Sequence, residues 1–478
     1  MKKLLFLIIG LCFVFAIHAQ QDFTLYYMDR AMQSQWVNPS HITPHKVNIG
    51  GMIVPLFGQI PPAMHFNYAN SALKYNDIFH MGTGLKSDSL VLDLPKFMDN
   101  VRAVNHMRFE NHFELFSLGL KSDKMFVTFA ITEKFNYGIS LPGDLFELAI
   151  NGNKQYMDEN KPLDFSRLNL SATYYREFAF GMSLEATEKL RVGARLKVLF
   201  GIANLNTNIR ELSLYTNPDN VYMTANTDMS MQFTTPIPVE YNYYSDGDSA
   251  SLEFAENSED YLLTTDFFLN MKNPGIAFDI GATYNLNNKI DLFFSATDLG
   301  FISWNSNPLS LTSKGNFLMK GIEVQFWNDE DQVDADLNAF ADSLLNTFHF
   351  EGNKESYFTM LPANVYIGGK YKLYDKIHFG ALYRAEFYKK SVLSSFTLSA
   401  NSNLTKWFTA HLSYTVANNN WSNLGFGFTL RGAFIQYFFV TDNFLGAIFP
   451  QKAQNLNFRM GCNLVFGREK EIKSDSFY

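Results

Sequence analysis

The stretch from Pro362 to Gly467 constrains this chain most, because it repeats one unit: about ten residues of alternating character, then a turn. Between Val365 and Leu373 every second residue is apolar or small, and mostly polar residues lie between them. The same alternation recurs in residues 377–387, 408–416 and 456–466. Such a pattern gives a strand one apolar and one polar face. The stretch therefore predicts consecutive β-hairpins, as in soluble sandwiches or membrane barrels.

The N-terminus favours the membrane alternative because it has the features of a secretory signal peptide. Lys2 and Lys3 precede an apolar core, Leu4 to Ile17, and Ala19 stands before a polar mature start. Cys12 lies within that core, but Leu11 before it is not the small residue that a lipoprotein signal requires, so lipidation is rejected. Residues 1–19 are predicted to be removed on export.

Composition agrees with an exported barrel. Beyond the signal peptide no apolar run reaches the roughly 18 residues of a membrane helix, and the chain contains 47 Phe and 24 Tyr. A barrel needs apolar residues only at alternate positions, with aromatic girdles at both interfaces. Cys462 is the one cysteine of the mature chain, which excludes an internal disulfide, and the net charge of −8 argues against a nucleic-acid partner. The predicted fold is an all-β, transmembrane antiparallel β-barrel of about 14 strands, with 12–16 open.

The lengths of the connections support this count. Short turns near residues 121, 186, 287, 375, 403 and 432 follow even-numbered strands, whereas long segments at 58–106, 206–273 and 303–361 follow odd-numbered ones. Bacterial barrels place both termini and the short turns in the periplasm, and the long loops outside. Short helices are expected in these loops, one capped by Asp144 and one amphipathic over residues 333–348. Segments 211–216 and 221–233 could add strands.

The predicted organisation is a signal peptide (1–19), an N-terminal plug segment (20–46), the barrel (47–467) and a charged periplasmic tail (468–478). A 14-stranded barrel is too wide for its own side chains to fill, and small inward residues such as Gly193 and Gly281 widen it. An aromatic segment tethered before the first strand could close the lumen; a disordered leader is the alternative. The plug candidates are Phe23, Tyr26, Tyr27, Met28, Trp36, Asn38 and Pro39.

Charged residues on the predicted inner face are the other candidate functional residues. They could select solutes by charge, or they could pair with one another in a plugged lumen. By the same alternation Phe278 and Ile280 face lipid and Thr283 faces the lumen, where an arginine should be tolerated. The lumen-lining candidates are Arg195, Lys197, Asp279, Lys370, Arg384, Glu386, Arg431 and Arg459.

No enzyme motif is present: the sequence has no nucleophile elbow, zinc-protease signature, phosphate loop or paired cysteines. His106 and His112 are read as structural rather than as part of a hydrolase site. We expect no enzyme activity, no cofactor and no metal. Acidic residues at 329–336 complement the dipole of the predicted amphipathic helix, and a calcium site is the alternative. For Asp246 and Asp248 a calcium site is likewise only an alternative.

Several motifs resemble known families. Phe23–Met28 followed by Asn38-Pro39 is similar to the start of Bacteroidota outer-membrane barrels, including the PorP/SprF family associated with type IX secretion. Residues 140–145 with 152–153, 298–304 and 457–467 resemble a related Bacteroidota family of unknown function. The plug also resembles that of fatty-acid-transporter-like barrels of fourteen strands.

These resemblances imply a location in the outer membrane of a Gram-negative bacterium, with outer-membrane lipid as a partner. The motifs that carry them are structural and say little about activity. The first functional hypothesis is passage of a small amphipathic or hydrophobic solute through the plugged barrel. The alternative, which the likeness to the PorP/SprF family implies, is a non-transporting barrel that anchors surface or secretion-system proteins.

Overall fold

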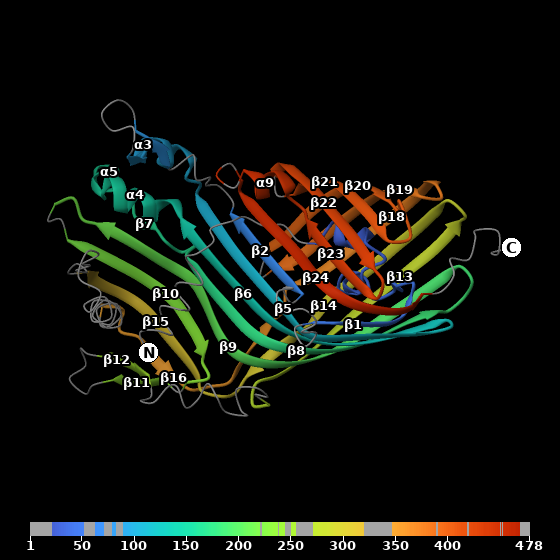
Figure 1. Ribbon diagram of the computed structural model, residues 1–478. Helices are drawn as coiled ribbons and strands as arrows, with labels where there is room; N and C mark the ends of the chain where they lie inside the picture. Colours follow the sequence, from blue (N-terminus) through green and yellow to red (C-terminus); the bar gives the residue numbers. More distant parts are fainter. Residues whose placement is uncertain are drawn as a thin grey trace.

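The chain forms a closed antiparallel barrel, shown by a computed structural model (Figure 1). The structure describes residues 22–51, 63–70, 79–82, 89–219, 222–237, 239–243, 250–254, 271–319, 347–388, 391–417, 420–449, 451 and 453–468. Strands β1 (His45–Gly50) and β2 (Met64–Asn70) share the first position, since both pair with the last strand, β24 (Asn455–Arg468), and with β5. Pairing of β24 with the first position closes the barrel.

The predicted number of fourteen strands is confirmed, because the pairings give fourteen positions around the wall. From the second position onward the wall consists of β5 (Val104–Ser122), β6 (Met125–Pro142), β8 (Asn169–Glu185), β9 (Leu190–Thr216), β13 (Pro274–Asn287), β14 (Ile290–Trp304), β18 (Ala363–Tyr374), β19 (Ile377–Tyr388), β20 (Ser391–Ser402), β21 (Phe408–Ala417), β22 (Asn420–Gly432), β23 (Ile435–Thr441) and β24.

Alternation along the strands separates an apolar outer face from a polar inner face. On β13 the outward side chains of Phe278 and Ile280 are 48% and 46% exposed, whereas Asp279 between them is fully buried. Large apolar residues occupy the same outward positions on neighbouring strands, for example Leu292 on β14 and Ile367 on β18. This continuous apolar band is the surface that a membrane barrel presents to lipid.

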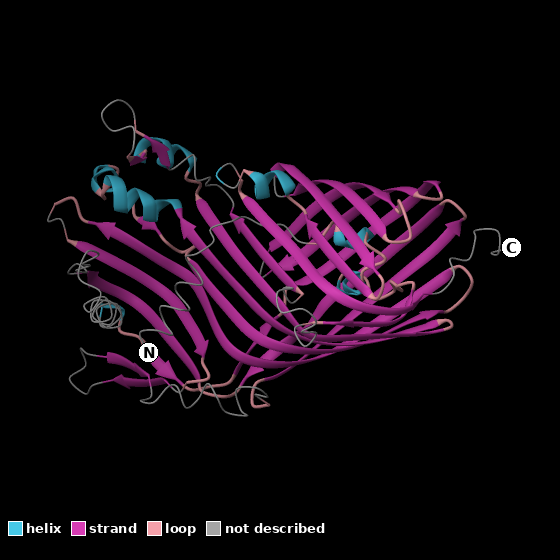
Figure 2. Cartoon of the chain, viewed as in Figure 1, coloured by secondary structure: helices cyan, strands magenta, loops and turns pink. Residues whose placement is uncertain are grey.

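The two ends of the barrel differ. Six short turns, including those at 122–125, 185–190 and 287–290, gather at the end of the barrel where β24 finishes (Figure 1). The opposite end carries longer connections with short helices (Figure 2). Among the described residues, no helix has the length and apolar character needed to cross a membrane. The elements of these connections are β3 (Phe79–Met81), β4 (Leu90–Leu92), α3 (Leu94–Asn100), α4 (Gly143–Asn151), α5 (Lys154–Asp158), β7 (Leu163–Asp164) and α9 (Phe444–Ile448).

The sequence predicts a long loop over residues 206–273, and this prediction is wrong for the first part of the range, which forms strands. Strand β9 continues to Thr216, and its last part pairs with β10 (Met223–Thr234). Strand β10 also pairs with β15 (Pro308–Met319), and β15 pairs with β16 (Glu351–Asn353). We call the part of β9 from Asn204 onward, with β10, β15 and β16, the side sheet. β11 (Val239–Tyr243) and β12 (Ala250–Phe254) form a separate hairpin, and β17 (Tyr357–Met360) pairs with β14.

The side sheet forms because apolar residues alternate with the polar ones in its sequence and give its strands one apolar face. Leu214 of β9, Ala225 of β10 and Leu311 of β15 are buried together, and Met229 and Met231 pack against them. These residues alternate with polar ones, which satisfies the period of a strand with one buried face. The side sheet therefore has a hydrophobic core outside the barrel lumen.

Other expectations need correction or fall outside the described residues. The sequence from residue 46 to residue 57 predicts the first strand, but β1 ends at Gly50, Gly51 adopts a positive φ of 102°, and residues 52–57 lie outside the described residues. Helix α4 begins after Pro142, so Asp144 lies in its first turn rather than at its cap. Most of the predicted helix at 333–348, the acidic residues at 329–336, and Asp246 and Asp248 lie outside the described residues.

Candidate functional site

The N-terminal segment from residue 22 to residue 43 lies inside the barrel and makes no strand pairing there. Two short 3-10 helices, η1 (Leu25–Tyr27) and η2 (Met32–Trp36), shape it. Asp442, next to the end of β23, accepts hydrogen bonds from the backbone nitrogens of Phe23 (3.1 Å) and Thr24 (2.8 Å). The Thr24 hydroxyl also donates to Asp442 at 2.6 Å. This carboxylate therefore satisfies backbone donors at the start of η1, which would otherwise be buried without partners.

Further hydrogen bonds fasten the middle and the end of the segment to the wall. The Ser295 hydroxyl donates to the carbonyl of Val37 at 2.7 Å, and the hydroxyls of Ser40 and Thr283 lie 2.7 Å apart. On the opposite side of the barrel, the side chain of Gln33 donates to Asn463 at 2.9 Å. Thr283 faces the lumen as predicted, but the plug covers its side chain, which is 1% exposed.

Aromatic packing fills the centre of the lumen. Tyr26 is 1% exposed and its ring centroid lies 5.4 Å from that of Tyr366 on β18 and 5.8 Å from that of Phe293 on β14. Its hydroxyl accepts a hydrogen bond from Asn38 at 3.0 Å. Met28 is fully buried in the same cluster. Burial of several such side chains stabilises the closed arrangement by about 2 kcal/mol each.

Glycines on the wall make room for the segment. A Cβ atom added to Gly193 would overlap the carbonyl of Pro39, and one added to Gly281 would overlap the side chain of Asn38. These two glycines are directly paired on β9 and β13. They were expected to widen the lumen, and in the structure they form the surface against which Asn38-Pro39 lies.

Two ion pairs join the plug to the wall. Asp22 lies 2.7 Å from the guanidinium of Arg459 on β24, and Asp29 lies 3.5 Å from the ammonium of Lys370 on β18. Trp36 stacks on the same guanidinium, 4.6 Å from its ring centroid. The segment thus supplies a carboxylate to Arg459 and a second carboxylate to Lys370, which also lies 3.8 Å from Asp291 of the wall.

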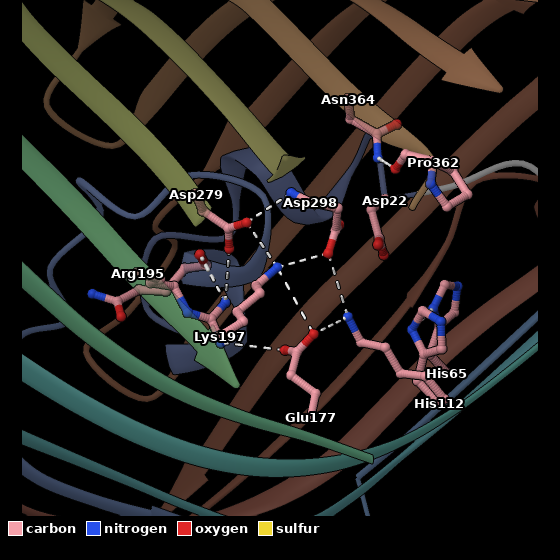
Figure 3. Close-up of polar contacts among 12 residues, drawn as sticks. Asp22, His65, His112, Glu177, Arg195, Lys197, Asp279, Asp298, Pro362 and Asn364 are labelled. Carbon is pink, nitrogen blue, oxygen red and sulfur yellow. Dashed lines mark hydrogen bonds and ion pairs between the residues drawn. The ribbon is translucent and has the colours of Figure 1, made fainter. Parts of the chain in front are cut away.

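A balanced charge network lies beside the plug (Figure 3). Lys197 of β9 lies 2.7 Å from both Asp279 and Asp298, and Glu177 of β8 lies 2.6 Å from Lys134 of β6. The backbone nitrogen of Asp298 donates to Asp279 at 2.7 Å. Arg195 completes the network, 3.8 Å from Asp279. Three cations and three carboxylates therefore neutralise one another across five strands.

A second network occupies another part of the inner wall. Arg108 of β5 pairs with Glu110 on its own strand and with Glu386 of β19, and Glu386 also lies 2.9 Å from Arg384. The amide of Asn67 donates to Glu110 at 2.7 Å. Because opposite charges are paired within these networks, the cost of burying each charge is offset by its neighbours.

The predicted lumen residues divide into three groups. Buried in the networks or against the plug are Arg195, Lys197, Asp279, Arg384, Glu386 and Arg459. Lys370 is partly buried and faces Asp29. Arg431 lies next to the turn between β22 and β23, where its side chain donates to the carbonyl of Ala433; it therefore sits at the barrel rim.

The predicted plug residues come together in the lumen. All belong to the segment that the barrel encloses: Phe23, Tyr26, Tyr27, Met28, Asn38 and Pro39 are buried, and Trp36 is half-buried over Arg459. His106 and His112, which the sequence analysis considered as hydrolase candidates, contact different residues. His112 of β5 is directly paired with His65 of β2, and their Nδ1 atoms lie 3.2 Å apart. His106 forms a hydrogen bond with the hydroxyl of Ser140.

Two small cavities adjoin the segment. A cavity of about 60 Å³ is lined by residues that include Tyr27, His41, Arg191 and Lys370, and another of about 10 Å³ lies beside Gln33. Burial, reinforced by the positive charge of Arg191, lowers the pKa of His41 to about 3. The imidazole is therefore neutral in the closed barrel. A cavity of 60 Å³ admits water rather than a solute.

Sequence reasoning missed Lys134, Glu177 and Asp298. Lys134 and Glu177 stand in phase with buried residues of their strands, so alternation alone could have found them. Asp298 could not be placed in this way because it adopts a positive φ of 59° at an irregularity of the β13–β14 ladder.

No curated protein matches the chain. The toluene transporter TbuX of Ralstonia pickettii is similar, with 10% identity, a TM-score of 0.42, and coverage of 92% of this chain and 95% of that one. A FadL homologue of Pseudomonas aeruginosa has 9% identity, a TM-score of 0.42 and coverage of 92% and 95%. The toluene transporter TodX of P. putida has 9% identity, a TM-score of 0.36 and coverage of 91% and 92%.

One family model matches residues 53–442, and its description is a family of unknown function, DUF5723. The match spans more than half of the sequence. The chain therefore belongs to DUF5723.

Proposed function

We propose that this protein is a gated barrel of the Gram-negative outer membrane, with both termini in the periplasm, that passes a small amphipathic or hydrophobic solute. The observation that carries the proposal is the nature of the plug. Residues 22–43 fill the lumen, yet they share no strand pairing with the wall. The segment can therefore leave without breaking the barrel, whose ladders stay closed from β1 to β24.

The outer surface supports the membrane location. Phe278, Ile280 and Leu292 belong to an apolar band that water would not favour, and the charged neighbours Asp279 and Asp291 are buried on the inner face. The orientation follows from the connections, because bacterial barrels keep short turns in the periplasm. The signal peptide expected at residues 1–19 would direct the chain to this compartment.

The lining of the lumen supports a solute with an apolar part and a polar part. Tyr26, Phe293 and Tyr366 contribute aromatic surface, and Lys370 and Arg191 contribute charge close by. A purely charged lumen would favour ions, but here the two charge networks are internally neutral. The proposal assigns the protein no catalytic role.

An uptake measurement tests this function. The full mature chain is placed in liposomes, and entry of the apolar fluorophore N-phenylnaphthylamine is compared with entry of glucose. We expect faster entry of the fluorophore than in protein-free liposomes, and no entry of glucose. Equal fluorophore entry with and without folded protein would overturn the proposal.

The side sheet favours a second candidate, a non-transporting anchor for surface or secretion-system proteins. Its core, which includes Leu214, Leu309 and Leu311, is separate from the cluster that contains the plug residues. Affinity purification from native membranes discriminates the two functions. Recovery of a stoichiometric partner, together with no solute uptake in liposomes, would favour the anchor.

A further inference from the structure

The short-turn rim of the barrel carries a repeated pair of residues. In four of the turns a lysine stands directly before the first residue of the next strand, and that first residue is a large apolar one. The pairs are Lys124-Met125, Lys189-Leu190, Lys289-Ile290 and Lys376-Ile377. Strands β6, β9, β14 and β19 therefore begin in the same way.

The apolar member of each pair faces outward. Met125 and Ile377 are 38% and 39% exposed, and Leu190 and Ile290 are in phase with the outward residues Val192 and Leu292. The lipid-facing band thus begins at the residue next to the lysine. The four ammonium groups consequently stand at the level where hydrocarbon meets lipid headgroups.

These four lysines differ from the cations of the lumen. Lys134, Lys197 and Lys370 each pair with carboxylates. In contrast, the described residues provide no ion pair or side-chain hydrogen bond for the four rim ammonium groups, all of which are exposed. Acidic neighbours in the turns, such as Asp123 and Asp375, do not bind them in the described structure.

From this geometry we infer that Lys124, Lys189, Lys289 and Lys376 bind the phosphate groups of phospholipids in the periplasmic leaflet. A compact ammonium group binds phosphate oxygens as a point charge, and each lysine near an anionic membrane surface strengthens binding about fivefold. Spaced along the part of the wall from β5 to β19, the four contacts fix the depth of this part of the barrel and favour anionic lipids. This inference rests on the proposed membrane placement and orientation.

Native mass spectrometry of the mature chain in nanodiscs tests it. The discs contain phosphatidylcholine and phosphatidylglycerol in equal amounts, and the retained lipids are counted. We expect wild type to retain phosphatidylglycerol preferentially. The variant K124Q/K189Q/K289Q/K376Q should lose this preference by roughly tenfold or more, whereas replacement of the same four lysines by arginine should preserve it.

A matched control changes charge at the other end: K154Q/K161Q/K314Q/K354Q should retain the wild-type preference. An unchanged preference in the rim variant, or an equal loss in the control, would overturn the inference. Loss of binding to isolated peptidoglycan with unchanged lipid retention would assign the lysines to the cell wall instead. Heat-modifiable migration in a denaturing gel checks folding, and failure of wild type to enter discs contradicts the membrane placement itself.

Discussion

The carboxylate of Asp22 lies 2.7 Å from the guanidinium of Arg459, so the first described residue of the chain is joined to its last strand. The two side chains are 14% and 4% exposed. Each of these buried charges is poorly hydrated, so removal of its partner would leave an uncompensated charge and destabilise the closed arrangement. The contact therefore couples closure of the lumen to closure of the wall.

Replacing Asp22 by Asn leaves Arg459 without its carboxylate. We expect the closed arrangement to lose about 3 kcal/mol, which corresponds to a population of released segments roughly a hundredfold larger. Limited proteolysis of the segment in reconstituted protein measures this population. The control is Asp228→Asn, which breaks the exposed pair with Lys314 on the side sheet and should cost no more than about 1 kcal/mol. Equal protease sensitivity of the two variants would contradict the coupling.

The glycines facing Asn38-Pro39 offer a second test. Gly193→Ala and Gly281→Ala each place a methyl group where the plug backbone or side chain lies, so each should weaken plug binding by about 1–3 kcal/mol. Gly432→Ala is the control, since no atom lies within 4 Å of its added Cβ. Accelerated hydrogen exchange in residues 22–43 of the first two variants alone is the expected outcome. Exchange that is unchanged in all three would mean that the segment does not lie against these strands.

Substitutions on β13 test the facing of its side chains. Phe278→Arg or Ile280→Arg should cost roughly 2–4 kcal/mol if the residue faces mid-bilayer. The sequence also predicted tolerance of Thr283→Arg, but the structure changes that expectation, because Thr283 is buried against Ser40. Equilibrium unfolding in urea should show losses for all three. In a chain that lacks residues 21–40, only Thr283→Arg should become mild; persistence of its full cost would contradict the contact with Ser40.

The barrel itself could be predicted from sequence because its signal is local. The alternation that predicted the β13 and β18 strands depends only on neighbouring residues, and the short turns fix the strand order. The side sheet was missed because Met229, Met231 and their neighbours lie in a segment of polar composition, which suggested a loop. Its stability comes from β15, about eighty residues away in sequence.

The candidate site was predictable in membership but not in arrangement. Alternation placed Arg195, Lys197 and Asp279 on the inner face, yet it could not show that Lys197 would bridge Asp279 and Asp298. That bridge depends on the positive φ of Asp298. Arg431 is in phase with the inward residues of β22, but it is the last residue but one of its strand, so its side chain reaches the turn at Ala433 instead of the lumen.

Acidification should favour release of the plug through His41. Burial lowers its pKa from 6.5 to about 3 in the closed barrel, whereas the exposed imidazole of a released segment would titrate near 6.5. The released state therefore binds the extra proton between these values, so closure is fully favoured above pH 6.5 and weakens by up to about 1.4 kcal/mol per pH unit below it. His41→Gln should reduce the pH dependence of segment proteolysis. An identical pH profile in the variant would exclude this residue.

The central claim is that the N-terminal segment closes the lumen, and single-channel recording in a planar bilayer tests it most directly. Wild type should show little conductance, because the buried residues of the segment, such as Tyr26 and Met28, pack against the wall inside the lumen. Deletion of residues 21–39 removes the plug and its contacts with Asp442 and Arg459, and should produce stable open channels while the barrel keeps its heat-modifiable migration. A folded deletion variant with unchanged, closed conductance would contradict the claim.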